Sequence, residues 1–272
     1  LETRAKRVRL PSNWPTYACQ ASVTGNFHVS STLSIASVNS FRFSRRSASM
    51  VRSVRKPVTV KMRTGWDTVG KNEAERFVRT VEDAGAAAIS VLTETAHFQG
   101  NLQHLHAVKE TVQPHGLPVL RKDFLFDPYQ VYEARAYGAD AILLIVAMLD
   151  HEQLAELLKV AQSLWLQCLV EVHSQEELRI ALDDGAEVIG INHRDLKTFQ
   201  SDTSLTQRLR PLIPQGKVVV AESGISSRED VERLKQAGAN AVLVGEALVT
   251  AKDVGAKVRE LTGQKVPSTG SL

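Results

Sequence analysis

Charged side chains that could carry acid–base chemistry follow apolar runs of this sequence. Lys122 ends the run 118–122, and Glu171 and Glu222 lie at the ends of two further runs. Carboxylate and ammonium groups whose pKa values are moved apart by burial and mutual charge can act as base and acid in one site. Lys122 is therefore the first candidate for a proton donor, although a solvated ion pair between Lys122 and Asp123 would give the same local pattern.

Other polar residues occupy the same kind of position, just after an apolar run. Lys61, Asn192 and Arg194 are the clearest of them. An amide and two further cations beside two carboxylates could orient a substrate and bind an anion. The sequence has neither a His-x-x-x-His nor a Cys-x-x-Cys pair, so we expect no metal site.

Two glycines near the end of the chain predict a phosphate site. Gly224 and Gly245 each follow an apolar run and precede an expected helix. Bare backbone at such a turn lets N–H groups face an anion, and a helix N-terminus adds to the attraction. Tight turns alone would also use glycine, but two loops with the same feature favour phosphate.

A repeat defines the elements that must position these residues. The segments 82–92, 134–145, 182–192 and 235–245 each contain a helix end, a glycine and an apolar strand. The glycines are Gly85, Gly138, Gly185 and Gly238. Their spacings of 53, 47 and 53 residues suit two strand–helix units each. Four more apolar strands lie at 57–62, 118–122, 167–172 and 217–223.

Amphipathic stretches follow all eight expected strands. The expected helices are 71–84, 101–113, 128–137, 151–164, 174–184, 203–212, 227–237 and 253–262. Apolar strands that alternate with helices predict a parallel sheet, and eight such units predict a closed α/β barrel of the TIM type. An open doubly wound sheet is the alternative, but no Gly-x-Gly-x-x-Gly follows the first strand.

The first 56 residues differ in composition from the rest. They hold ten Lys and Arg, eleven Ser and one acid, without a sustained period, so we expect a poorly ordered basic extension. The composition also suits an organellar transit segment or a nucleic-acid-binding tail. We expect the barrel at 57–263 and a short tail at 264–272.

The body of the chain excludes several classes of partner. Residues 57–272 carry 23 bases against 29 acids, so nucleic acid is not expected to bind. The longest apolar run, 141–149, is too short to span a membrane. Cys19 and Cys168 lie far apart and give no disulfide framework. We therefore expect a cytoplasmic protein, or an organellar one if residues 1–56 act as a transit segment.

Several stretches between residues 82 and 263 resemble the indole-3-glycerol-phosphate synthases. They read SVLTETAHFQGN, LPVLRKDFLFDPYQVYEARAYGADAILLIVAMLD, LVEVHSQEEL, IGINHRDLKTF, VAESGISSREDV and AVLVGEALV. The resemblance implies a ribulose-phosphate-binding barrel and a carboxy-lyase of tryptophan biosynthesis. Its reaction closes the indole ring of 1-(2-carboxyphenylamino)-1-deoxyribulose 5-phosphate with loss of CO2 and water. It implies no cofactor, a small sugar-phosphate substrate, and a monomer or weak oligomer.

The resemblance also implies roles for individual residues. Lys122 matches the general acid and Glu171 its acid/base partner, while Asn192 orients the reacting groups. The remaining matches are Arg194 for the anthranilate carboxylate, Glu222 and Ser223 as support, Phe98 and Phe124 beside the aromatic ring, and Gly224, Gly245 and Glu246 for phosphate.

The first expected strand departs from this family. The family has a Glu-x-Lys pair there, followed by a Ser-Pro-Ser-x-Gly loop. Here Lys61 keeps the lysine, Thr59 replaces the glutamate, and residues 64–67 replace the loop. Residues 57–70 instead resemble the FMN-dependent tRNA-dihydrouridine synthases, without their catalytic Asn-x-x-Cys-Pro loop. Three hypotheses remain: an active or weakened synthase, a non-catalytic barrel that binds a sugar phosphate or serves as a scaffold, or a flavoprotein acting on RNA.

Overall fold

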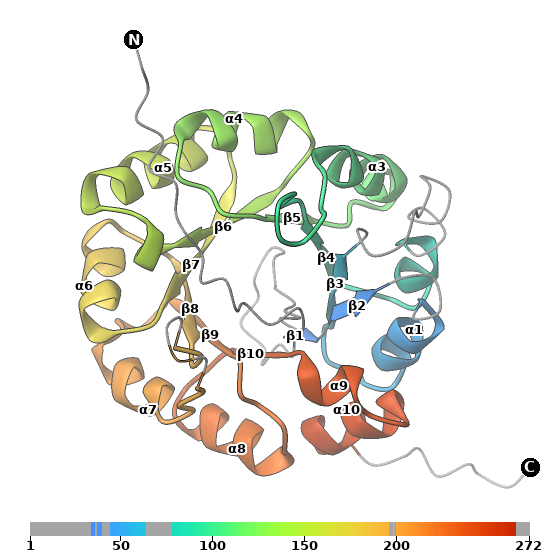
Figure 1. Cartoon of the computed structure of the whole chain (residues 1–272). Coiled ribbons are helices and arrows are strands. Elements are labelled where there is room, and N and C mark those ends of the chain that lie inside the picture. The colour runs from blue at the N-terminus through green and yellow to red at the C-terminus, as the bar shows by residue number, and fades with distance from the viewer. Residues whose placement is uncertain are drawn as a thin grey trace, which may run out of the picture.

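The computed structural model describes residues 34–35, 37–39, 44–63, 78–195, 198 and 200–264. They form one parallel sheet that curls into a ring, with helices around its outside (Figure 1). The order around the sheet is β1-β10-β9-β8-β7-β6-β5-β4-β3-β2. The α/β barrel predicted from the repeat is therefore confirmed.

Eight of the ten strands are those that the apolar runs predict. They are β3 (Thr59–Arg63), β4 (Ala88–Leu92), β5 (Val119–Lys122), β6 (Ala141–Ile145), β7 (Gln167–Val172), β8 (Val188–Asn192), β9 (Val218–Glu222) and β10 (Ala241–Val244). Each pairs in parallel with the next along the chain.

The helices on the outside also follow the predicted order. They are α3 (Leu102–Val112), α4 (Pro128–Ala136), α5 (His151–Ser163), α6 (Gln175–Asp183), α7 (Leu205–Leu209), α8 (Arg228–Gln236), α9 (Glu246–Val249) and α10 (Val254–Thr262). Residues 78–82 are helical too. The short α9 was not predicted, since four residues are too few to show a helical period. Among the described residues, no helix is both long enough and apolar enough to cross a membrane.

The barrel begins earlier in the chain than the repeat predicts. Strand β1 (Ser34–Ile35) pairs with β10, and β2 (Ser37–Asn39) pairs with β3. Helix α1 (Ser44–Arg52) packs against α10. Strands of two and three residues are too short to show an alternating period, which explains why the sequence pattern missed them. Residues 1–33 lie outside the described residues, so the predicted extension there stays a prediction.

Side chains alternate along each strand between two apolar layers. One layer joins strand residues such as Val60, Val170 and Ile191 to the helices. The other, with Leu120 and Leu169, consists mainly of strand residues and fills the inside of the ring. Since successive strand residues point to opposite faces, a residue's position within its strand decides whether it faces the helices or the interior.

The repeated glycine turns lead into the strands at the amino-terminal edge of the barrel. Gly138 and Gly238 have φ of 90° and 93°, a region that residues with a side chain rarely adopt. Two residues later, the backbone N–H of Asp140 donates to Val119 O, and its carboxylate accepts from Val119 N, both at 2.8 Å. Asn240 makes the same pair of bonds with Val219. Each side chain thereby extends the hydrogen-bond ladder between neighbouring strands.

We predict that Asp140→Ala lowers the free energy of unfolding by about 1–3 kcal/mol, because it leaves the buried N–H of Val119 without its acceptor. Urea denaturation measures the change. Asp140→Asn is the matched control: it keeps an acceptor, as Asn240 does, and loses only the ion pair with Lys109 at 2.7 Å. That loss should cost about 0.2–1 kcal/mol. Equal losses in both variants would show that the ion pair, not the backbone bond, matters.

Candidate active site

Four of the predicted catalytic residues lie at the carboxyl ends of β5, β7, β8 and β9. Lys122 ends β5, Glu171 lies near the end of β7, and Asn192 and Glu222 end β8 and β9. All four alternate with residues that face the helices, so they point into the ring. Glu171, Asn192 and Glu222 are buried, and Lys122 is half-buried.

Glu171 is held by two neighbours through one of its oxygens. The amide Nδ2 of Asn192 donates to Oε1 of Glu171 at 3.0 Å. The ring nitrogen Nε2 of His173 lies 3.3 Å from the same oxygen. On the other side of the imidazole, Nδ1 lies 3.1 Å from Oε2 of Glu177. Asn192 is fixed in turn, because its Oδ1 accepts from the backbone N–H of Arg194 at 3.0 Å.

The two buried carboxyl groups have opposite protonation preferences. Burial alone would raise the pKa of Glu171, but contacts with His173, Lys122 and Asn192 hold that pKa well below its usual range. Burial raises the pKa of Glu222 well above its usual range, and the charge of Glu171 raises it further. Two carboxylates in contact cannot both stay ionised without a large cost. The site therefore holds one anion and one neutral acid.

A close approach of two strands gives the Glu222 carboxyl its place. A Cβ added to Gly190 on β8 would lie 2.2 Å from Oε1 of Glu222 and 3.3 Å from Leu169 Cδ1. Real contacts of this kind are longer, so only glycine leaves room for the carboxyl. Gly190 is the strand neighbour of Glu171. Because Gly190 has no side chain, the carboxyl group of Glu222 fits against β8, close to Glu171 on β7.

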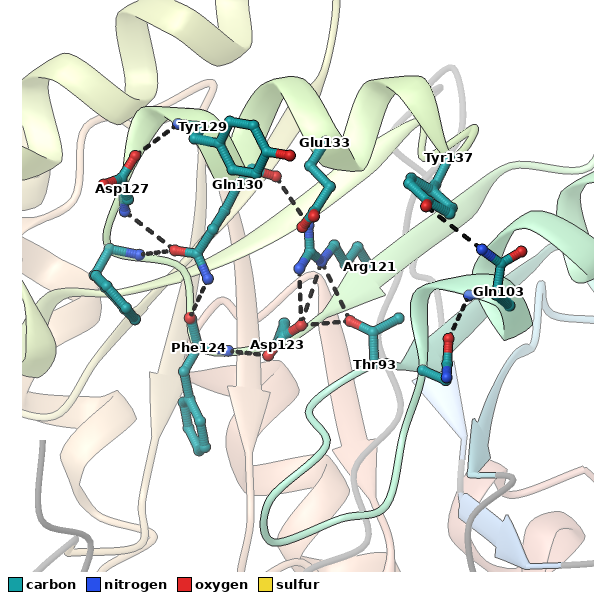
Figure 2. A network of polar contacts seen from close by, with 12 residues as sticks. Thr93, Gln103, Arg121, Asp123, Phe124, Asp127, Tyr129, Gln130, Glu133 and Tyr137 are labelled. Atoms are coloured by element: carbon teal, nitrogen blue, oxygen red, sulfur yellow. Dashed lines mark hydrogen bonds and ion pairs between the residues drawn. The ribbon is translucent and has the colours of Figure 1, made fainter. Parts of the chain in front are cut away.

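Arg121, next to Lys122, anchors the end of β5 from the outer side (Figure 2). Its guanidinium is buried and forms ion pairs with Asp123 at 3.0 Å and Glu133 at 2.9 Å. It also donates to Gln130 O on α4 and to Thr93 Oγ1 after β4. Because these bonds join three elements around one strand end, they fix the backbone from which Lys122 points inward.

The predicted aromatic pair also comes together. The rings of Phe98 and Phe124 have centroids 6.3 Å apart with planes tilted by 50°. Phe98 lies in a loop organised by Glu94, whose carboxylate accepts three backbone N–H groups, among them that of Phe98 at 2.9 Å. Phe124 is half-buried beside the apolar interior of the ring. An apolar wall therefore stands next to Lys122.

The predicted anion-binding residues line one cavity of about 380 Å³. It contains Arg194, Ser223, Gly224, Gly245 and Glu246. Ser223 has φ of 69°, unusual for a residue with a side chain. Arg194 has a buried Nε without a hydrogen-bond partner among the described residues, and its Nη2 lies 3.9 Å from Glu246. Arg194 thus shares the cavity of the phosphate candidates.

Strand β3, which carries Lys61, lies across the ring from β7 and β8 (Figure 1). Its neighbours Val60 and Met62 pack toward the helices, so Lys61 faces the interior. Its side chain is buried, and so is that of Thr59, two residues earlier on the same face. The hydroxyl groups of Thr59 and of Ser90 on the neighbouring strand are buried without partners among the described residues. The replacement loop 64–67 lies outside the described residues.

Reasoning from the sequence left several residues of the site without a role. His173 follows Glu171 by two positions and therefore shares its face, which places it at the strand end, but the pattern is also typical of a surface histidine. Arg121 and Gly190 gave no such signal, because their contacts come from other strands and helices. Within the described residues, no cluster of His, Cys, Asp and Glu could hold a metal ion.

Solved structures with the same architecture include sugar-phosphate enzymes. A 3-hexulose-6-phosphate synthase from Salmonella typhimurium has a TM-score of 0.58 at 19% identity, over 75% of this chain and 96% of that one. A deoxyribose phosphate aldolase from Aeropyrum pernix has a TM-score of 0.54 at 16% identity, over 84% and 100%. At these identities the likeness establishes the fold alone.

Sequence comparisons are more specific. The family model described as indole-3-glycerol phosphate synthase matches residues 67–261. An indole-3-glycerol phosphate synthase of Dehalococcoides mccartyi is 58% identical, over 65% of this chain and 68% of the relative. One of Roseiflexus is 54% identical, over 69% and 71%. The family match begins after β3, so Lys61 and Thr59 lie outside it. By the match to residues 67–261, the chain belongs to the indole-3-glycerol phosphate synthase family.

Proposed function

We propose that the chain closes the indole ring with Lys122 as general acid and Glu171 as its acid/base partner. The family is one of carboxy-lyases in tryptophan biosynthesis, and its substrate is a small sugar phosphate. The observation that carries the assignment is the convergence of Lys122, Glu171 and Glu222 at one end of the ring, with the carboxyl groups held in opposite protonation states.

The reaction needs a proton donor and a proton acceptor in turn. The aromatic carbon that bears the carboxylate attacks the ketone carbonyl, and Lys122 gives a proton to the carbonyl oxygen. CO2 then leaves. The new hydroxyl takes up a second proton from an ammonium group of the site and departs as water, and a base removes the proton that completes the aromatic ring. Glu171 suits the base role because it stays ionised beside a protonated Glu222.

The two ends of the substrate fit different parts of the site. Phe98 and Phe124 supply a wall for the aromatic ring, next to Lys122. The backbone of Gly224, Gly245 and Glu246 takes the phosphate. Arg194 and Ser223 line the same cavity, and Arg194 is the cation for an anionic group of the substrate. Asn192 orients Glu171 through its 3.0 Å hydrogen bond.

The altered first strand lowers the rate without removing the function. Lys61 keeps a buried ammonium group on the interior face, while Thr59 supplies no carboxylate. Loss of one acid/base group typically costs about 10²–10⁴ in rate. A cytoplasmic protein, a monomeric or weakly associating state, and function without cofactor or nucleic acid complete the proposal.

Lys122→Ala should lower kcat by about 10²–10⁴-fold, because the proton donor is gone while the fold is kept. Fluorescence of the indole product, formed from the anthranilate-derived sugar phosphate, measures the rate. Lys217→Ala is the matched control: it removes a lysine of a surface ion pair with Glu187 at 2.6 Å and should leave kcat unchanged. Normal turnover by Lys122→Ala would rule out the assigned general acid.

Thr59→Glu should raise kcat by about tenfold or more, because it restores a carboxylate two residues before Lys61 on the interior face. The same fluorescence assay measures it. Thr59→Gln has the same size without the charge and should give no gain. An unchanged rate for a folded Thr59→Glu variant would mean that this position does not correspond to the family's glutamate.

Gly190→Ala should reduce kcat by about 10²-fold, because the new methyl group displaces Glu222 from its place beside Glu171. Circular dichroism checks that the barrel remains folded. Glu222→Gln provides the comparison, since both variants disturb the same carboxyl group. Wild-type kcat in Gly190→Ala would show that the position of Glu222 does not limit the reaction.

A further inference from the structure

His173 lies between two carboxylates at the mouth of the ring. Its Nε2 is 3.3 Å from Oε1 of Glu171, and its Nδ1 is 3.1 Å from Oε2 of Glu177. The backbone N–H of His173 also donates to Oε2 of Glu177 at 2.7 Å. Glu177 belongs to α6, so the imidazole joins the end of β7 to the helix that follows it. Only 10% of the His173 side chain is exposed.

This arrangement favours an imidazolium ion. Burial alone would lower the pKa of His173, but Glu171 and Glu177 raise it to about 10. A neutral imidazole carries one N–H, whereas the cation carries two and can pair with both carboxylates. Nδ1 is hydrogen-bonded to Glu177, and Nε2 forms an ion pair with Glu171 without hydrogen-bond geometry. At neutral pH, His173 is therefore positively charged and lies against the acid/base candidate.

The neighbouring carboxyl group makes this charge important. Glu171 and Glu222 are both buried, and the proximity of Glu171 helps to raise the pKa of Glu222. Oε2 of Glu171 and Oε1 of Glu222 are buried without a hydrogen-bond partner among the described residues. Nothing in the chemical type of the two side chains decides which one is ionised. Their surroundings must decide it, because two interacting groups titrate as a pair.

We propose that His173 is a positioning residue that keeps Glu171 ionised and leaves the shared proton on Glu222. Its charge lies next to Glu171, and its contact with Glu177 fixes the ring in that place. The charges of His173 and of Lys122 on β5 lower the pKa of both carboxyl groups, but the ion pair of His173 at 3.3 Å is with Glu171. Asn192 on β8 adds a neutral hydrogen bond to Glu171. This inference rests on the proposed role of Glu171.

The pH profile of kcat/KM tests the role of His173. In the wild-type protein Glu171 stays ionised down to low pH, so the acid side of the profile should be flat. His173→Asn removes the cation, which should move the acid limb up by about 1–3 pH units. The rate then falls as pH decreases, because a protonated Glu171 cannot accept a proton. An unchanged acid limb in a folded His173→Asn variant would overturn the proposal.

Two further variants make the test robust. Glu177→Gln keeps His173 and removes the carboxylate on the outer side of the imidazole. The acid limb of this variant should shift in the same direction by less, and no shift would contradict the role of Glu177 in fixing His173. His151→Asn is the matched control, since it breaks another His–carboxylate pair, with Asp184 at 2.8 Å, whose imidazole is exposed. Its profile should match the wild type, and a shifted limb there would show that the effect is not specific to His173.

Glu171→Gln separates this inference from the proposed function. If Glu171 is the acid/base group, this variant should lose about 10²–10⁴ in kcat at every pH. Full activity in Glu171→Gln would reject the role of Glu171 and, with it, that of His173. Loss of activity in Glu171→Gln together with a wild-type acid limb in His173→Asn would reject His173 alone.

Discussion

The burial of two carboxyl groups side by side is the constraint on which the site depends. An isolated buried carboxylate is costly, and a second one beside it costs more. The chain meets this constraint with charges of the opposite sign: Lys122 at the end of β5 and His173 just after β7 lower the pKa of Glu171. Glu222 meets it by staying neutral. Acid–base chemistry then follows from the same electrostatics that makes the burial tolerable.

Rigid supports outside the ring maintain these short distances. Arg121 ties β5 to α4 and to the loop after β4, while Glu177 ties His173 to α6. Both supports use buried or partly buried charges, which are worth more than exposed ones because less water screens them. Contacts with helices outside the ring therefore help to fix the positions of the catalytic side chains. Gly190 acts in the opposite way, since it contributes space rather than a contact.

Reasoning from the sequence located most of the barrel, because apolar strands and glycine turns repeat with a clear period. Lys122, Glu171 and Glu222 could be predicted because each ends such a strand. His173 could not be told from a surface histidine, since its partner Glu177 is brought back only by the start of α6. Whether Arg121 and Lys122 point inward or outward also depends on strand register, which the amino-acid sequence alone does not determine. Strands β1 and β2 were too short to produce any pattern.

The pairing of β1 with β10 has a consequence for how the molecule assembles. Strand β10 is the last strand in sequence order, whereas β1 comes before all the others. Their hydrogen bonds join residues more than two hundred positions apart, such as Ser34 and Leu243. During synthesis, β1 cannot pair with β10 until residues 241–244 have been made. Contacts between distant parts of a chain form slowly, so ring closure should be a late step and the stage most exposed to misassembly.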